Sequence, residues 1–218
     1  MAKVKVKICG ITNWADARCA CEAGADFLGF NFYRDSPRYI EPTKAREIVR
    51  RLPRDVAAVG VFVNEPEESL LKTARAVGLK GVQLHGDETP SLVSRLRRSA
   101  RSIKVIKAIC VRRTLGARQL ARFANASAIL LDGFGGVRRG GTGRKFDWSL
   151  IPRRRRRAPI FLAGGLTPQN VADAIHTVRP YAIDVCSGVE SAPGKKSRAK
   201  IKALMCAING SDLERKKK

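Results

Sequence analysis

The chain has 218 residues, of which 44% are hydrophobic, so it can bury the core of one α/β barrel. Its 43 basic and 19 acidic residues give a formal net charge of +24, which is unusual for a metabolic enzyme and attracts polyanions. We find no signal segment, no apolar run near 18 residues and no zinc-like spacing of cysteine and histidine. We therefore expect a cytoplasmic chain that has neither a membrane segment nor a metal site.

Apolar segments of strand length alternate with helical segments along the chain. The first strand, residues 3–9, alternates lysines with apolar residues and leads into a helix at 13–23. The later strands are predicted at 26–31, 56–63, 81–86, 103–108, 127–132, 159–163 and 181–186. The later helices are predicted at 43–52, 66–77, 90–98, 114–123, 146–151, 167–177 and 197–208.

These pairs of strand and helix predict a single α/β domain over residues 1–218, a closed (β/α)8 TIM barrel. A doubly wound sheet is the alternative, although it usually has fewer strands. We find no hairpin signal and no linker, and residues from about 211 to 218 form a short basic tail. The five arginines at 153–157 precede the seventh strand, so we expect them at the N-terminal end of the barrel.

Polar residues end several of the predicted strands, where barrel enzymes carry their functional groups. Strands one and six lie roughly across the barrel from one another, so Cys9 and Asp132 could flank a ligand. The polar residues at the strand ends are Cys9, Asn31, His85, Asp132 and Asp184.

Cys9 shares a strand face with Lys7, and an ammonium beside a thiol favours the reactive thiolate. The alternative is an edge strand with solvated lysines and an inert cysteine. Asp132 ends an inward-facing stripe that contains Ala128 and Leu130. A carboxylate there acts either as a general acid or base, which we favour, or as a helix cap.

Glycine-rich loops follow strands six, seven and eight, and each can bring backbone N–H groups to an anion. Barrels commonly hold a phosphate at the loops after strands seven and eight. None of these loops matches a nucleotide-binding pattern, so the expected ligand is a small phosphate ester, unless the glycines only allow tight turns. The phosphate-binding residues that we expect are Gly141, Thr142, Gly164, Gly165, Ser187 and Gly188.

Short motifs run from the first strand to the last helix and together resemble the phosphoribosylanthranilate isomerase family. They are KICGIT at 7–12, SPRYI at 36–40, VQLHG at 82–86, LD at 131–132, GGTG at 140–143, FDW at 146–148, LAGGL at 162–166, and DV at 184–185 followed by APGK at 192–195. The first and the last of these motifs are the most specific.

The resemblance implies a barrel that rearranges N-(5-phosphoribosyl)anthranilate to 1-(2-carboxyphenylamino)-1-deoxyribulose 5-phosphate, in tryptophan biosynthesis, without cofactor or metal. It implies that Cys9 is the general base, that Asp132 is the general acid, and that Arg38 faces the anthranilate carboxylate. Further substrate-binding residues are expected at Lys7, Gln83, His85 and Asp184. Asp184 could instead play a structural role, facing lysines inside the barrel.

Two features depart from the family. Cys186 stands where a small hydroxyl residue is usual, and we expect it to affect at most the packing beside the phosphate loop. The arginine run at 153–157 replaces an ordinary surface segment.

Two other functions compete with this interpretation. The related histidine-pathway isomerase performs the same rearrangement on a larger substrate, but it has an aspartate where this chain has Cys9. A basic barrel that binds polyanions without catalysis would explain the charge, but both candidate catalytic residues are retained. Non-specific polyanion binding alongside catalysis stays open, and we expect a monomer or a homodimer.

Overall fold

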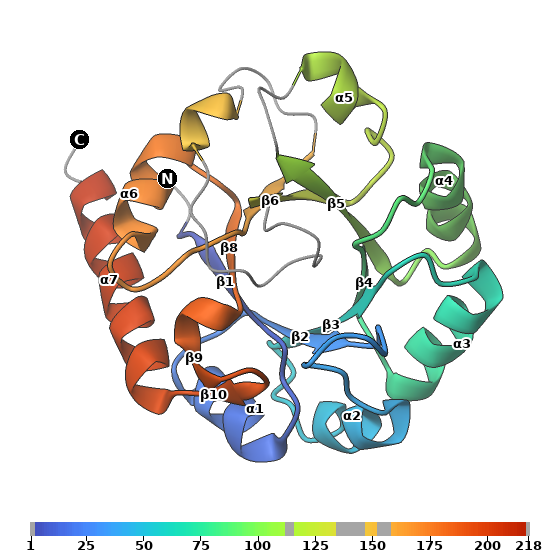
Figure 1. The fold of residues 1–218 in the computed structure, drawn as a ribbon, viewed down its shortest axis with the longest axis horizontal. Coiled ribbons are helices and arrows are strands. Elements are labelled where there is room, and N and C mark those ends of the chain that lie inside the picture. The colour runs from blue at the N-terminus through green and yellow to red at the C-terminus, as the bar shows by residue number, and fades with distance from the viewer. Residues whose placement is uncertain (1–2, 112–115, 134–146, 152–157, 217–218) are drawn as a thin grey trace.

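Eight parallel strands close into a barrel with helices around it (Figure 1). The computed structural model describes residues 3–111, 116–133, 147–151 and 158–216. Each strand pairs with the next, and β8 pairs with β1 to close the sheet. The strands are β1 (Lys5–Cys9), β2 (Phe27–Asn31), β3 (Ala57–Phe62), β4 (Gly81–Leu84), β5 (Lys104–Val111), β6 (Ala128–Gly133), β7 (Ile160–Leu162) and β8 (Ala182–Val185). The predicted (β/α)8 fold and all eight predicted strands are thus confirmed.

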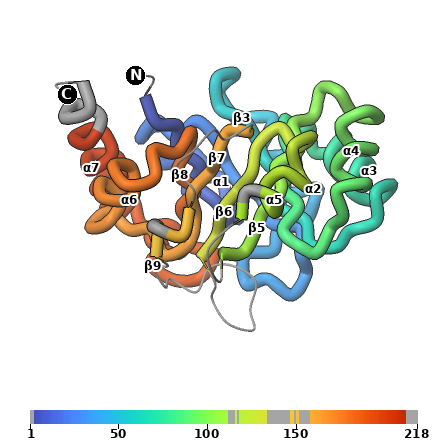
Figure 2. Tube along the Cα trace, turned by 90° about the horizontal axis from the view of Figure 1, so that it is seen from above, coloured from blue at the N-terminus to red at the C-terminus, as the bar shows by residue number. Residues whose placement is uncertain are grey.

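The helices lie on the outside of the barrel, and α6 and α7 run side by side in both views of the backbone (Figures 1 and 2). Helix α1 begins where expected, because the Asn13 side chain accepts a hydrogen bond from the Asp16 N–H at 2.9 Å. The helices are α1 (Trp14–Glu22), α2 (Pro42–Val49), α3 (Glu67–Val77), α4 (Pro90–Ser99), α5 (Ala117–Ala121), α6 (Val171–Val178) and α7 (Arg198–Lys216).

Several predicted helices begin later than expected; α5, predicted from residue 114, begins at Ala117. The helix predicted at 167–177 begins at Val171, because the Asn170 side chain accepts a hydrogen bond from the Thr167 N–H at 2.9 Å and holds these residues in a turn. Pro66 is the cap of α3 and not its first helical residue. The helix predicted at 146–151 is, within the described residues, only the 3-10 turn η1 (Trp148–Leu150).

A hairpin follows β8, which contradicts the expectation that the chain contains none. The turn η2 (Ser187–Val189) leads into β9 (Glu190–Ala192), which pairs with the antiparallel β10 (Lys195–Lys196). Gly194 in the turn has φ +77°, a conformation that glycine adopts without strain. The hairpin lies at one end of the barrel (Figure 2).

The last helix is longer than expected. Helix α7 ends at Lys216, so it includes most of the residues that were predicted to form a basic tail from about 211. The arginine run at 153–157 and the glycine loop at 140–143 lie outside the described residues. In the ranges that the structure does describe, no helix is long and apolar enough to cross a membrane.

Buried apolar side chains form two groups, one between the sheet and the helices and one inside the barrel. Val6 and Ile8 of β1 belong to the outer group, whereas Lys7 between them points inward. Ala128 and Leu130 of β6 belong to the inner group, which confirms that Asp132 continues an inward-facing stripe. The period of two therefore assigns the functional side chains to the barrel interior.

A buried ion pair fixes the loop that follows β4. Lys107 Nζ lies 2.8 Å from Glu88 Oε2 and also donates to the carbonyl oxygens of Gly86 and Leu84. Glu88 accepts hydrogen bonds from the N–H groups of Gly86 and Asn64. All these contacts hold the segment that contains His85.

We expect Glu88→Leu to lower the free energy of unfolding by about 3–5 kcal/mol, because it leaves the Lys107 ammonium buried without its partner. Urea unfolding followed by circular dichroism measures this difference. The matched control is Glu67→Leu, which breaks the exposed ion pair with Arg95 and should cost at most about 1 kcal/mol. If the two variants lower the free energy of unfolding equally, the buried pair of Lys107 and Glu88 contributes no more to stability than the exposed pair.

Candidate active site

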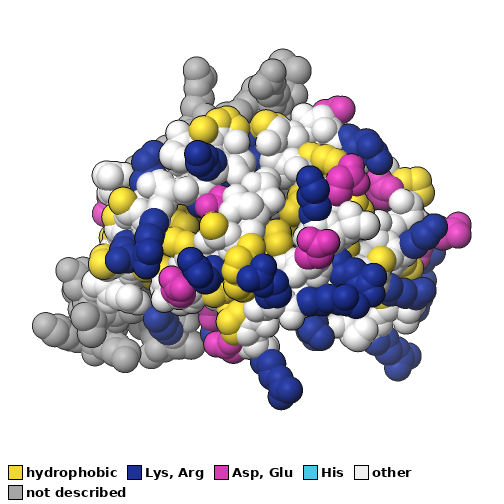
Figure 3. Space-filling view, turned by 90° about the horizontal axis from the view of Figure 1, so that it is seen from below, with side chains coloured by type: hydrophobic (Ala, Val, Ile, Leu, Met, Phe, Trp, Pro, Cys, Tyr) yellow, Lys and Arg dark blue, Asp and Glu magenta, His cyan; other side chains and the backbone are white. Residues whose placement is uncertain are grey.

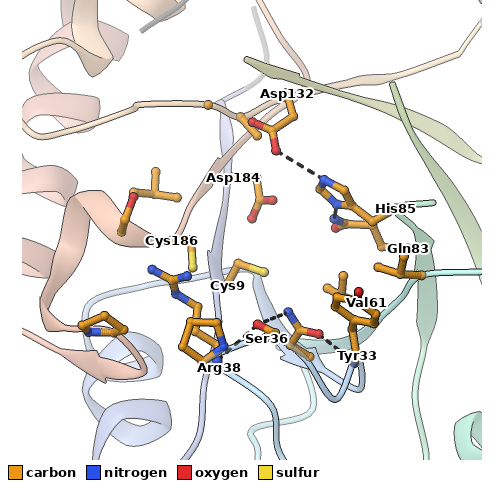
Figure 4. A pocket seen from close by; sticks show the side chains of 18 of the residues that line it. Cys9, Tyr33, Ser36, Arg38, Val61, Gln83, His85, Asp132, Asp184 and Cys186 are labelled. Atoms are coloured by element: carbon orange, nitrogen blue, oxygen red, sulfur yellow. Dashed lines mark hydrogen bonds and ion pairs between the residues drawn. The ribbon is translucent and has the colours of Figure 1, made fainter. Parts of the chain in front are cut away.

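A cavity of about 1020 Å³ opens at the C-terminal ends of the strands. It has the size of a site for a small organic ligand. All five polar residues that were expected at the strand ends line it, and so do Arg38, Gln83, Gly164, Gly165 and Ser187. Figure 4 shows the central side chains converging on this space from several strands. Two expected phosphate-binding residues, Gly141 and Thr142, lie outside the described residues.

Cys9 lies at the end of β1, close to the side chain of Cys186 (Figure 4). A hydrogen bond from the Cys186 thiol is the largest cause that lowers the pKa of Cys9, and the charges of Lys7 and Lys196 add to it against the effect of burial. The same hydrogen bond, together with burial, raises the pKa of Cys186. Cys9 is therefore the thiol that more readily forms a thiolate, the reactive form of the group.

Lys7 is fully buried below the cavity, and its ammonium is surrounded by acceptors. Its Nζ donates to Asp184 Oδ1 and to Gln83 Oε1, both at 2.9 Å. Burial disfavours the charge, but Asp184 and Cys9 outweigh this effect, so the pKa of Lys7 is raised. Lys7 thus remains charged beside Cys9, as the shared strand face predicted.

Asp184 comes from β8 and reaches the cavity from the same side as Lys7. Burial raises its pKa to about 7, although the charge of Lys7 acts in the opposite direction. The contact with Lys7 corresponds to the structural role that the sequence left open. Asp184 also lines the cavity, so contact with a ligand remains compatible with this role.

Asp132 lies on β6, apart from Cys9, and faces the ring of His85 (Figure 4). Its Oδ2 is 3.3 Å from His85 Nε2, and the other ring nitrogen, Nδ1, is 2.7 Å from Gln83 Nε2. The acid candidate and the thiol candidate thus occupy separate parts of the cavity, with room for a ligand between them.

Arg38 is held at the rim of the cavity by the hairpin that the sequence did not predict. Its Nε and Nη2 both bond to the Glu190 carboxylate, with the shortest distance 2.6 Å. Lys196 lies 2.8 Å from the same carboxylate. Burial favours the neutral acid, but Arg38 and Lys196 outweigh it and lower the pKa of Glu190. Glu190 therefore fixes the position of Arg38 as a charged partner.

The loops after β7 and β8 approach each other beside the cavity. A Cβ atom on Gly188 would lie 1.9 Å from the Leu166 carbonyl oxygen. One on Gly164, also in the loop after β7, would lie 2.2 Å from the nitrogen of Gly133 at the end of β6. Only glycine allows this close approach. A second hollow of about 300 Å³ opens there, lined by Gly165, Leu166, Thr167, Ser187, Gly188 and Lys200.

Three residues at the site were missed by the sequence analysis. Glu190 and Lys196 gave no signal, because their roles depend on a hairpin with a short second strand. Cys186 was noted as a departure that affects at most the packing, whereas its thiol contacts Cys9. Its Sγ also lies 3.9 Å from Lys196 Nζ and 3.8 Å from Glu190 Oε1.

The strand ends of this closed barrel bring a thiol of lowered pKa and a carboxyl group to one cavity. The protein therefore belongs to the class of barrel enzymes that use general acid–base catalysis. The chain belongs to the N-(5'-phosphoribosyl)anthranilate (PRA) isomerase family, whose model matches residues 6–207. The family resemblance inferred from the motifs is thereby confirmed.

Several relatives of known name support this assignment. The chain is 48% identical to the N-(5'-phosphoribosyl)anthranilate isomerase of Citrifermentans bemidjiense over 203 residues, which are 92% of this chain and 95% of that protein. It is 46% identical to that of Rubrobacter xylanophilus, over 93% of this chain and 98% of that protein.

Solved structures show the same similarity. The phosphoribosyl anthranilate isomerase of Thermotoga maritima is 48% identical, with a TM-score of 0.84 over 95% of this chain and 99% of that chain. Another phosphoribosyl anthranilate isomerase structure, 47% identical with a TM-score of 0.81 over 95% and 99% of the two chains, was solved in complex with reduced 1-(o-carboxyphenylamino)-1-deoxyribulose 5-phosphate.

Proposed function

We propose that this chain rearranges N-(5-phosphoribosyl)anthranilate to 1-(2-carboxyphenylamino)-1-deoxyribulose 5-phosphate, a step of tryptophan biosynthesis. The family membership supports the reaction, and so does the related structure that holds the reduced product. The single observation that carries the proposal is the placement of Cys9 and Asp132 in separate parts of one cavity (Figure 4).

The reaction needs an acid and a base in succession. Asp132 gives its proton to the ring oxygen of the sugar, the bond from C1 to that oxygen breaks, and the nitrogen lone pair forms a C1=N double bond. The Cys9 thiolate then removes the proton from C2, and the electron pair of that bond neutralises the nitrogen as an enamine. Return of a proton to C1 and loss of the C2 hydroxyl proton give the ketone. Since the steps only move protons and bonding electrons, the proposed reaction uses no redox cofactor.

The remaining expected residues would hold the two anionic ends of the substrate. Arg38 would face the anthranilate carboxylate, and the loops with Gly164, Gly165, Ser187 and Gly188 would offer N–H groups to the phosphate. The hollow between these loops supports this placement. Lys7, Gln83, His85 and Asp184 would shape the floor of the cavity below the sugar.

The proposal is tested by turnover of the purified protein. Anthranilate, phosphoribosyl pyrophosphate and a phosphoribosyltransferase generate the substrate, whose consumption is followed spectroscopically. We expect consumption that depends on this protein and yields the aminodeoxyribulose product. Unchanged substrate would overturn the proposal, whereas turnover of only the larger histidine-pathway substrate would favour that competing isomerase.

We expect Arg38→Met to raise KM about tenfold or more and to change kcat by less than about threefold, because a charge-assisted hydrogen bond contributes about 1.5–3 kcal/mol to binding. Steady-state kinetics measure both constants. Arg34→Met is the matched control, since it removes an equal charge from the same loop at an exposed position. If both variants raise KM equally, the effect is one of general charge and Arg38 has no specific contact.

We also propose that the basic surface binds polyanions non-specifically. Lys and Arg side chains gather over one part of the surface (Figure 3), and Arg98 and Arg101 near the end of α4 are exposed. Retention on heparin that falls steeply with salt would support this binding, and passage through the column at low salt would contradict it.

The location and assembly of the chain are further proposals. A cytoplasmic location fits a catalytic thiol, because a reducing compartment keeps such a group free, and all six cysteines are free. We propose that the chain is a monomer or a homodimer, since a related structure is described as mutually generated monomers of a dimeric phosphoribosylanthranilate isomerase from Thermotoga maritima. Size-exclusion chromatography with light scattering distinguishes the two.

A further inference from the structure

A continuous series of polar contacts crosses the floor of the cavity from β8 to β6. Asp184 Oδ1 and Gln83 Oε1 each lie 2.9 Å from Lys7 Nζ. Gln83 Nε2 lies 2.7 Å from His85 Nδ1, and His85 Nε2 lies 3.3 Å from Asp132 Oδ2. Four strand ends therefore contribute to one connected set that begins beside the thiol and ends at the candidate acid.

Lys7 determines which atom donates and which accepts in each of these hydrogen bonds. An ammonium group can only donate hydrogen bonds, so the atom of Gln83 that faces it must be the amide oxygen. The amide nitrogen of Gln83, which can only donate, then faces His85 Nδ1. Nδ1 must accept, so the proton of the neutral imidazole resides on Nε2. Gln83 is 1% exposed, so water offers little competition for these contacts.

The opposite tautomer would be costly. A proton on Nδ1 would face the amide N–H of Gln83 at 2.7 Å, so that two donors would meet. Rotating the amide by half a turn would relieve this contact, but it would bring the amide N–H against the Lys7 ammonium. Each arrangement leaves a buried donor without an acceptor.

The fixed tautomer has a consequence for Asp132. The Nε2–H of His85 faces Oδ2, so this oxygen is the acceptor of the pair. The proton of the neutral acid is then left to the other oxygen, Oδ1. A Cβ built on Gly164 would lie 2.9 Å from Oδ1, which places this oxygen beside the loop after β7, at the lining of the cavity.

We propose that Gln83 is a positioning residue that holds His85 as the Nε2–H tautomer, so that Asp132 carries its transferable proton on Oδ1. This inference rests on the proposed function for the role of that proton. The series does not conduct protons from Asp132 to Cys9. To pass a proton on, the Gln83 amide would have to convert to its imidic acid tautomer. Gln83 acts through His85 and Asp132 and does not touch the reacting atoms.

The tautomer can be observed directly by 15N NMR of the imidazole nitrogens. The chain has only two histidines, so His176→Gln, a change on α6 outside the cavity, assigns the His85 signals. We expect an unprotonated Nδ1 and a protonated Nε2 in the otherwise unchanged protein. A protonated Nδ1 on a neutral ring would overturn the proposal, whether or not the protein turns over the substrate.

Gln83→Glu keeps the size of the side chain but places a hydrogen-bond acceptor, in place of a donor, opposite His85 Nδ1. A carboxylate oxygen accepts from His85, so the proton should move to Nδ1, and kcat should fall about tenfold or more while KM changes less than about threefold. The matched control Gln119→Glu adds the same charge at an exposed position of α5 and should alter neither readout. An unchanged tautomer, or a moved proton with unchanged kcat, would overturn the positioning role.

If Gln83→Glu fails to fold, Gln83→Met keeps the length of the side chain and removes both polar atoms. We then expect signals of both tautomers, because nothing distinguishes Nδ1 from Nε2 at that contact. A pure Nε2–H form in this folded variant would overturn the proposal. An absence of turnover in the unchanged protein contradicts the proposed function alone, since the tautomer is measured without substrate.

Discussion

Cys9→Ala is expected to reduce turnover to the limit of detection while leaving the affinity for a reduced product analogue nearly unchanged. The thiolate removes the C2 proton, and the alanine side chain has no group that can accept it. A general base contributes about 10²–10⁴-fold to a rate. Single-turnover kinetics together with equilibrium binding measure the two effects separately.

The control is Cys206→Ala, since Cys206 is exposed on α7 and does not line the cavity. Its turnover should match that of the unchanged protein. The product analogue should also protect Cys9 from alkylation more than it protects Cys19 or Cys206. Substantial activity in Cys9→Ala would mean that another group is the base.

Asp132→Asn is expected to reduce kcat by about 10²–10⁴-fold, because an amide of the same shape cannot transfer a proton to the ring oxygen. The loss should resemble that of Cys9→Ala, since ring opening must precede removal of the C2 proton. Steady-state kinetics and binding of the reduced product analogue separate this loss from a loss of affinity.

The control for this variant is Asp173→Asn, which makes the same change at an exposed position of α6. It should keep the kcat of the unchanged protein. If Asp132→Asn retains most of its kcat, another group protonates the ring oxygen and Asp132 serves only as the partner of His85.

The sequence predicted the parts of the molecule that depend on local pattern. Alternation along β1 separated Val6 and Ile8 from Lys7, and the structure places them on opposite sides of the sheet. Functional residues of barrels lie at the C-terminal ends of the strands, and this rule predicted that Cys9 and Asp132 line one cavity although they are far apart in the chain.

The parts that sequence could not predict depend on contacts between distant segments. Arg38 and Glu190 are 152 residues apart, and only the closure of β8 against β1 brings them together. The contact between Cys9 and Cys186 has the same origin. The late start of α6 has a local cause, because the Asn170 side chain accepts a hydrogen bond from the Thr167 N–H and so competes with helix formation. Helix propensities of single residues do not reveal this competition.

The central claim is that Cys9 acts as a deprotonated base and Asp132 as a protonated acid in the same reaction. The pH profile of kcat/KM tests it most directly. The profile should rise with pH as Cys9 loses its proton, below the ordinary range of a thiol because its pKa is lowered. It should fall again at higher pH, because the reaction also needs a protonated acid. The rising limb should be missing from any residual activity of Cys9→Ala. A profile of the unchanged protein that is flat between about pH 5 and 9 would contradict the pair.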